Sequence, residues 1–158
     1  MDSRFCWPGS ASGQGSRLYV TEVNGSTPKS LATVNGDWVL VAPDGRSFLA
    51  LENGGRVVRS LQENTAKPIP GLQAADFPIA WASDSRHIFM QVETATGLTI
   101  YKMDLESGRR ELWQTATPND QVGLRPVSSP TAITPDGRWI AFSYGTRLGQ
   151  LYSSDTLK

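Results

Sequence analysis

The sequence is poor in the residues from which metal and redox sites are usually built. Among its 158 residues there are one cysteine, Cys6, and one histidine, His87. A single cysteine cannot form an internal disulfide, and one thiol with one imidazole cannot supply the ligands of a usual structural zinc site. We therefore expect no metal site, nothing in the sequence indicates a cofactor, and no pattern assigns Cys6 a role.

Long apolar runs and an excess of one charge are missing as well. No run approaches the roughly 20 apolar residues that cross a bilayer, and residues 1–15 lack the charged region and apolar stretch of an export signal. Fifteen lysines and arginines balance fifteen aspartates and glutamates, so the chain as a whole presents no basic surface. We expect no nucleic-acid partner and no insertion into a membrane.

The sequence also lacks the apolar periodicity of helices. Fifteen glycines and ten prolines divide the chain into short pieces, and none keeps a 3.6-residue apolar period over the length of an ordinary helix. Since 39% of the residues are hydrophobic, the chain can still build a core. The sequence predicts a globular all-β protein.

One five-residue phrase occurs three times. Its copies are Ala42-Pro43-Asp44-Gly45-Arg46, Ala82-Ser83-Asp84-Ser85-Arg86 and Thr134-Pro135-Asp136-Gly137-Arg138. Short apolar stretches flank each copy, which indicates a hairpin turn: aspartate accepts backbone N–H bonds there, and glycine supplies a positive φ. The predicted structural turn residues are Asp44, Gly45, Asp84, Asp136 and Gly137. Ser85 replaces glycine and makes the middle copy the least regular.

A second element follows the hairpins, an alternating strand with a branched or aromatic residue near its start. Its copies are Leu18-Tyr19-Val20, Val57-Val58-Arg59, Ile100-Tyr101-Lys102 and Leu151-Tyr152-Ser153. The first three continue into a polar turn and a further short strand. Four antiparallel strands, repeated with the phrase aspartates 40 and 52 residues apart, are typical of the blades of a β-propeller.

The strand count predicts a partial β-propeller of about three to four four-stranded antiparallel blades. We expect a flexible leader over 1–15, a partial blade over 16–34, full blades over 35–72 and 73–116, and a partial blade over 128–158. These hold thirteen strands, fewer than a closed ring of four-stranded blades requires. Because open ends expose apolar faces and strand edges, we expect a homo-oligomer or completion by further blades.

The repeat resembles a known family. Asp136-Gly137-Arg138-Trp139-Ile140-Ala141-Phe142 and the segment 100–105 resemble TolB-like (WD-repeat-like) propeller repeats, and the resemblance extends over residues 16–158. The tail 147–158 is similar to the C-terminal end of propellers appended to bacterial eukaryotic-like serine/threonine kinases and to some winged-helix regulators. The resemblance implies a non-catalytic interaction or sensor module that binds protein or peptide, on the extracytoplasmic or periplasmic side; without the appended-sensor role, a cytoplasmic location is expected.

An alternative follows from the same resemblance. Similar repeats form the gating propeller of prolyl oligopeptidase-type peptidases, whose catalytic domain is a separate α/β-hydrolase that this sequence does not contain. Within the sequence itself, no serine stands at the centre of a Gly-x-Ser-x-Gly elbow. His87 follows a turn at the same repeat position as Ser47 and Trp139, which indicates a surface or packing role. We expect no catalytic residues.

Binding residues are expected where the first strand of each blade begins, because propeller ligands usually meet the loop-rich mouth of the ring. The predicted ligand-binding residues are Asp37, Trp38, Asp76, Phe77, Ser128 and Ser129. Most of the remaining aromatic residues stand at repeat-equivalent strand positions, which favours packing between blades over an exposed binding surface. These residues are Trp81, Trp113, Trp139, Tyr19, Tyr101 and Tyr152.

Overall fold

The computed structural model shows a chain made of strands and turns. It describes residues 4–9, 16–34, 39–52, 55–63, 65–94, 97–123, 131–147 and 149. In these ranges there are thirteen strands and no helix, so no described helix is available to cross a membrane. The all-β prediction is confirmed.

The strands form four sheets, and in each sheet every strand pairs antiparallel with its neighbours in the chain. The first sheet has the order β1 (Arg4–Gly9), β2 (Arg17–Glu22), β3 (Lys29–Thr33). The second has β4 (Val39–Val41), β5 (Ser47–Glu52), β6 (Gly55–Ser60), β7 (Ala66–Pro68). The third has β8 (Phe77–Trp81), β9 (His87–Glu93), β10 (Leu98–Asp104), β11 (Arg110–Ala116). The fourth has β12 (Thr131–Ile133) and β13 (Ile140–Phe142).

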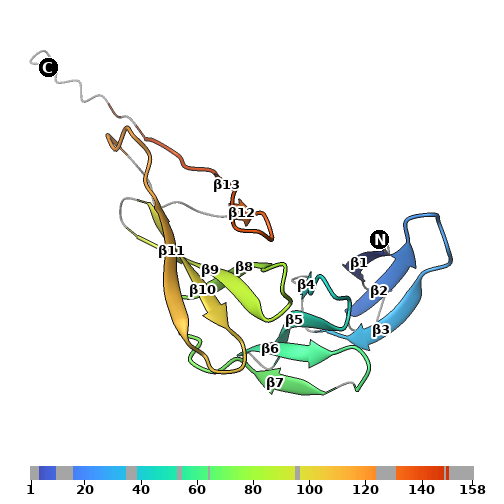
Figure 1. Ribbon diagram of the computed structural model, residues 1–158. Coiled ribbons are helices and arrows are strands. Elements are labelled where there is room, and N and C mark those ends of the chain that lie inside the picture. Colours follow the sequence, from blue (N-terminus) through green and yellow to red (C-terminus); the bar gives the residue numbers. More distant parts are fainter. Residues whose placement is uncertain are drawn as a thin grey trace, which may run out of the picture.

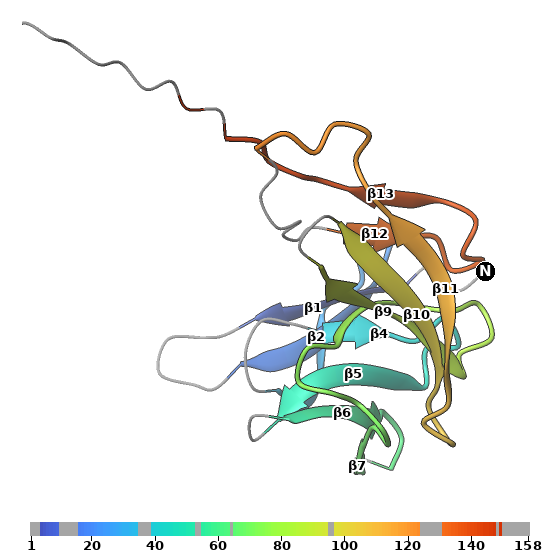
Figure 2. The same ribbon diagram turned by 90° about the vertical axis from the view of Figure 1, so that its left-hand side faces the viewer.

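The sheets follow one another in space as they do in the chain (Figures 1 and 2). The short first strands β4, β8 and β12 contact each other in that order, and β1 contacts β4. This is how blades stand around the axis of a propeller, with the first strand of each blade innermost.

The N-terminal segment differs from the prediction of a flexible leader. Residues Arg4–Gly9 form β1, which pairs with all six residues of β2, from Arg4 opposite Glu22 to Gly9 opposite Arg17. Pro8 and Gly9 conceal this strand in the sequence because both residues ordinarily interrupt strands. β1 has a partner on one side only in the described sheet, and such an edge position tolerates proline. Among the described residues, the first blade therefore has three strands rather than the predicted two.

Strand register corrects the alignment of the second repeated element. The pairs Ser47–Ser60 and His87–Asp104 start the middle ladder of the second and third sheets, respectively. When residues are counted from these pairs, Val57 in the second sheet is equivalent to Tyr101 in the third. The sequence pattern instead matches Val58 to Tyr101. A one-residue shift moves a side chain to the other face of its sheet, and only pairing with the neighbouring strand determines it.

Three clusters of buried side chains fill the spaces between consecutive sheets. The cluster between the first and second sheets holds Leu18, Val34, Phe48 and Ala50. The next holds Ala42, Leu49, Ile69, Trp81, Ile88, Met90 and Met103, and the third holds Ala82, Phe89, Leu98, Ile100, Ala116 and Ile133. Neighbouring residues of one strand thus enter different clusters, as Phe48 and Leu49 do, so both faces of the second and third sheets are covered.

The fourth sheet is covered differently. Ile140 and Phe142 pack against the third sheet, but Ala141 between them is exposed. Ala141 occupies the repeat position of Leu49 and Phe89, both of which are buried by a following sheet. In the described part of the chain, no cluster joins the fourth sheet to the first.

The repeated turns share one hydrogen-bonding pattern. A carboxylate oxygen of Asp44, Asp84 or Asp136 accepts the backbone N–H two residues later, at 2.9, 3.0 and 3.1 Å. Gly45 and Gly137 have φ values of 66° and 72°. At Gly137 space matters too, because a Cβ atom would lie 2.6 Å from the Trp113 ring, whose Nε1 donates to the Gly137 carbonyl oxygen at 3.1 Å.

The aromatic residues follow the packing prediction only in part. Trp81 is 4% exposed and lies in the cluster between the second and third sheets. Trp113 is 38% exposed and packs against Phe89, and Trp139 is 72% exposed. The packing prediction is wrong for Trp139, which directly precedes β13. Trp38 and Tyr152 lie outside the described residues.

Candidate functional site

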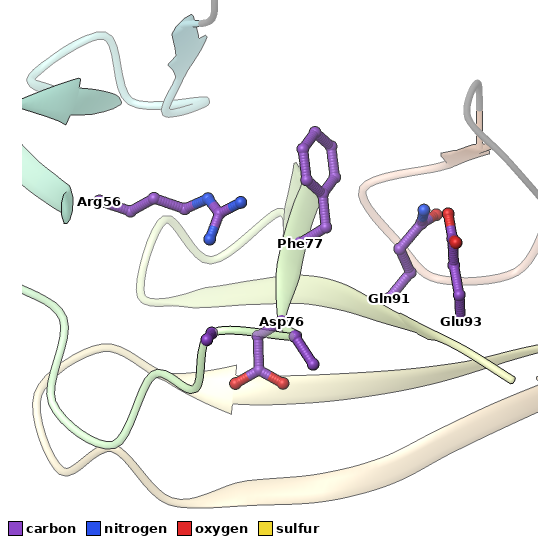
Figure 3. A pocket seen from close by; sticks show the side chains of 7 residues that line it. Arg56, Asp76, Phe77, Gln91 and Glu93 are labelled. Atoms are coloured by element: carbon purple, nitrogen blue, oxygen red, sulfur yellow. The ribbon is translucent and has the colours of Figure 1, made fainter. Parts of the chain in front are cut away.

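A cavity of about 440 Å³ lies where β8 begins and β9 ends (Figure 3). Its lining residues come from the second sheet, from the connection to the third sheet and from the third sheet itself. They are Arg56, Ala74, Ala75, Asp76, Phe77, Gln91 and Glu93. Two of the predicted ligand-binding residues, Asp76 and Phe77, are therefore brought together at one cavity. Its volume is in the range of small-molecule sites.

The Asp76 carboxylate anchors the connection that leads into β8. Its side chain is fully buried, one oxygen accepts the Gln73 N–H at 2.7 Å, and Arg110 Nη1 lies 3.0 and 3.2 Å from the two oxygens. In Figure 3 the carboxylate points away from the Phe77 ring. Both Asp76 oxygens already form hydrogen bonds within the protein. Direct contact between Asp76 and a ligand therefore stays a prediction.

The Phe77 ring meets a cation from the neighbouring sheet. Arg56 at the start of β6 places its guanidinium carbon 5.3 Å from the ring centroid, within the range of a cation–π contact. In Figure 3, Arg56 lies on one side of Phe77, and Gln91 and Glu93 lie on the other. The cavity thus spans two blades and has an aromatic ring between its charged residues.

The Gln91 side chain leaves a buried polar atom at the cavity without a hydrogen-bond partner in the described part of the protein. The residue is 2% exposed, and its Oε1 has no hydrogen-bond partner among the described residues. A buried amide oxygen without a partner costs free energy, so it marks a site where a ligand or a water supplies the missing donor. Gln91 pairs with Phe77 across the β8–β9 ladder, which fixes both residues at the cavity wall.

Glu93 lies two residues beyond Gln91 on the same strand, and both side chains line the cavity. It is exposed and forms no ion pair within the described ranges. Arg56, Gln91 and Glu93 are not among the predicted ligand-binding residues. A signal for Gln91 was available, because Leu51 occupies its repeat position and the polar residue interrupts an otherwise apolar strand.

Four predicted ligand-binding residues, Asp37, Trp38, Ser128 and Ser129, lie outside the described residues. Their roles stay predictions.

A second group of charged residues lies at the opposite ends of the same strands. His87 Nδ1 is 2.7 Å from Asp84 Oδ2, and His87 Nε2 is 3.6 Å from Asp104 Oδ2. Arg86 Nε donates to the same Asp104 oxygen at 2.6 Å. These contacts join the turn before β9 to the turn after β10, so His87 takes part in packing between turns.

Electrostatics favours the ionised form of both carboxylates in this group. Burial opposes the charge of Asp84, but the N–H groups of His87 and Arg86 and the His87 ring outweigh it and lower its pKa to about 2. The Ser107 N–H, followed by Arg86, lowers the pKa of Asp104. In the described part of the chain, no group of three or more His, Cys, Asp or Glu side chains could hold a metal ion.

Comparisons with known proteins identify the fold of this chain. No protein-family model matches the chain, and no curated protein matches it. It is similar to the crystal structure of TolB from Acinetobacter baumannii, with 19% identity and a TM-score of 0.53 over 90% of this chain and 36% of that one. It is also similar to the structure of a TolB candidate from Agrobacterium tumefaciens, with 16% identity and a TM-score of 0.57 over 92% of this chain and 56% of that one. This chain has a TolB-like β-propeller fold.

This chain is similar to a prolyl endopeptidase structure as well, with 15% identity and a TM-score of 0.56 over 90% of this chain and 25% of that one. The chain thus spans between 25% and 56% of the length of these structures. Together with the strand order, the comparisons confirm the prediction of a partial β-propeller.

Proposed function

We propose that this TolB-like propeller is a non-catalytic module that binds protein or peptide at the cavity of Phe77 and Gln91. One observation carries the proposal: a cavity at the start of an inner strand contains a buried amide oxygen without a hydrogen-bond partner. Ligands commonly bind where the loops of a rigid β scaffold converge. Phe77 supplies an apolar surface, and Arg56, Gln91 and Glu93 supply polar groups around it.

We further propose that the ring is completed by other blades, most simply those of a second copy of this chain. Support comes from Ala141, which is exposed although the equivalent Leu49 and Phe89 are buried. Burying apolar surface contributes roughly 25 cal/mol per Å². Covering the exposed face of the last described blade, where Ala141 lies, therefore favours association.

A second candidate function is the gating propeller of a peptidase, favoured by the similarity to the prolyl endopeptidase. The two functions differ in what the same gene encodes. An α/β-hydrolase domain in the same polypeptide would favour the peptidase, and a kinase or winged-helix domain would favour the sensor.

An array of immobilised short peptides tests the main proposal. We expect the wild-type chain to be captured by a subset of sequences and Phe77→Ala to lose roughly tenfold in affinity for that subset, as truncation of a central aromatic contact does. His87→Gln is the matched control, because His87 lies at the other ends of the strands. Equal capture of wild type and Phe77→Ala, or capture of neither, would reject binding at this cavity.

A further inference from the structure

We infer that the cavity selects peptides with a cationic group, which lies against Glu93 while a backbone amide of the peptide pairs with the Gln91 side chain. The inference rests on the proposed function and specifies its ligand class. It depends on three features of the cavity wall: the unpaired amide oxygen of Gln91, the distribution of charge and the spacing of the two residues along β9.

The Gln91 amide matches a peptide group. A primary carboxamide carries both a donor and an acceptor, and so does the peptide unit, with its N–H and C=O. Gln91 is 2% exposed, and its Oε1 is buried without a partner in the described part of the protein. A bound peptide N–H can donate to this oxygen once the Gln91 side chain turns toward the cavity, whereas an apolar ligand would leave it unsatisfied.

The charges of the lining make a cation the favoured partner next to Gln91. Of the two carboxylates, Asp76 is neutralised by Arg110 at 3.0 Å, and Glu93 has no ion pair among the described residues. Among the described lining residues the one cation is Arg56, which rests on the Phe77 ring, on the other side of that ring from Glu93 (Figure 3). A ligand ammonium or guanidinium can therefore approach Glu93 without meeting Arg56, and a ligand carboxylate there would be repelled.

The spacing suits an extended chain. Gln91 and Glu93 are two residues apart on one strand, which places them about 6 to 7 Å apart along it. An extended peptide repeats its own groups at the same interval. One ligand can therefore place an amide at Gln91 and a cationic group at Glu93.

Three tripeptides, all amidated at the C-terminus, test this inference by chemical-shift titration against the full chain. H-Ala-Ala-Ala-NH2 carries an α-ammonium, Ac-Ala-Lys-Ala-NH2 carries a side-chain ammonium, and Ac-Ala-Ala-Ala-NH2 carries no charge. We expect at least one cationic peptide to bind fivefold or more tightly than the neutral one, and the better of the two identifies the source of the cation. Glu93→Gln should abolish the difference, and the matched control Glu111→Gln, on the outer strand of the same blade, should keep it.

Gln91→Met provides a second measurement. Because methionine has a similar volume and no unpaired polar atom, we expect this variant to melt at a higher temperature and to bind all three peptides at least fivefold more weakly. Higher thermal stability with unchanged binding would overturn the role of Gln91. A Gln91→Met variant that fails to fold would overturn it too, because the amide would then serve the fold.

The outcomes separate this inference from the proposed function. If cationic and neutral peptides bind equally and Phe77→Ala weakens both, the cavity binds peptides but the cation selection is wrong. If none of the three binds and the peptide array captures nothing, the proposed function fails as well.

Discussion

The indole Nε1 of Trp81 donates a hydrogen bond of 2.9 Å to the backbone carbonyl oxygen of Leu40, 41 residues earlier. Leu40 lies in the inner strand of the second sheet, and Trp81 ends the inner strand of the third. This one bond joins consecutive blades near the axis, next to the cluster that Trp81 shares with Leu49 and Ile88.

Replacing Trp81 by phenylalanine should destabilise the protein. The variant loses the buried hydrogen bond and leaves a small space, which we expect to lower the free energy of unfolding by about 1–3 kcal/mol. Urea unfolding followed by circular dichroism measures the change. Trp139→Phe is the control, because Trp139 is 72% exposed and its replacement should change the value by less than about 0.5 kcal/mol. Equal effects of the two substitutions would contradict the packing described here.

A hydrogen bond of the Ser85 side chain accounts for serine in place of glycine in the middle turn. Its φ is 55°, a region that favours glycine, yet its hydroxyl accepts the N–H of Asp44 in the preceding blade at 3.0 Å. We expect Ser85→Ala to destabilise the protein by about 1 kcal/mol, since the bond is lost and the backbone conformation is kept. Ser85→Gly loses the bond but relieves the backbone and should stay within about 0.5 kcal/mol of wild type. Thermal melts of both variants test the order, and an alanine variant as stable as the glycine variant would contradict it.

Asp84 should make stability depend on pH in the acid range. Its pKa is about 2 in the folded chain, below the ordinary 3.8, so its contribution is complete above about pH 4 and is lost as the pH falls toward 2. We expect Asp84→Asn to lose less stability than wild type between pH 5 and pH 2. Melting temperatures measured across this range test the sign. A parallel fall for both proteins would show that Asp84 does not contribute.

The exposed face of the last described blade, where Ala141 lies, should drive self-association of this chain. We expect wild type to sediment as a dimer or larger species at high micromolar concentration, and Ala141→Lys to sediment as a smaller species, because a charge at the position of Leu49 and Phe89 cannot be buried without a partner. Ala66→Lys on the outer strand β7 is the matched control and should behave as wild type. A wild-type monomer at these concentrations would reject completion of the ring by a second copy.

Local features of the fold could be predicted from the sequence, and long-range ones could not. The turns around Asp44, Asp84 and Asp136 are encoded within a few residues, so the hairpins and the blade period were evident. β1 was missed because Pro8 and Gly9 mask it, and its pairing with residues 17–22 is not a local property.

The candidate site also contains residues that could be predicted from the sequence and residues that could not. Phe77 was predicted because it starts an inner strand, a position visible in the repeat. Arg56 and Gln91 reach the cavity from two different sheets, and their meeting depends on strand register and on the packing of one blade against the next. Sequence spacing contains neither quantity.

Chemical-shift mapping of a bound peptide on isotope-labelled protein tests the central claim most directly. The account predicts that a peptide selected from the array shifts the backbone signals of Arg56, Phe77 and Gln91 and leaves those of Arg86 and His87 unchanged. Shifts confined to Arg86, His87 and the turns beside them would place binding at the opposite ends of the strands and contradict the account.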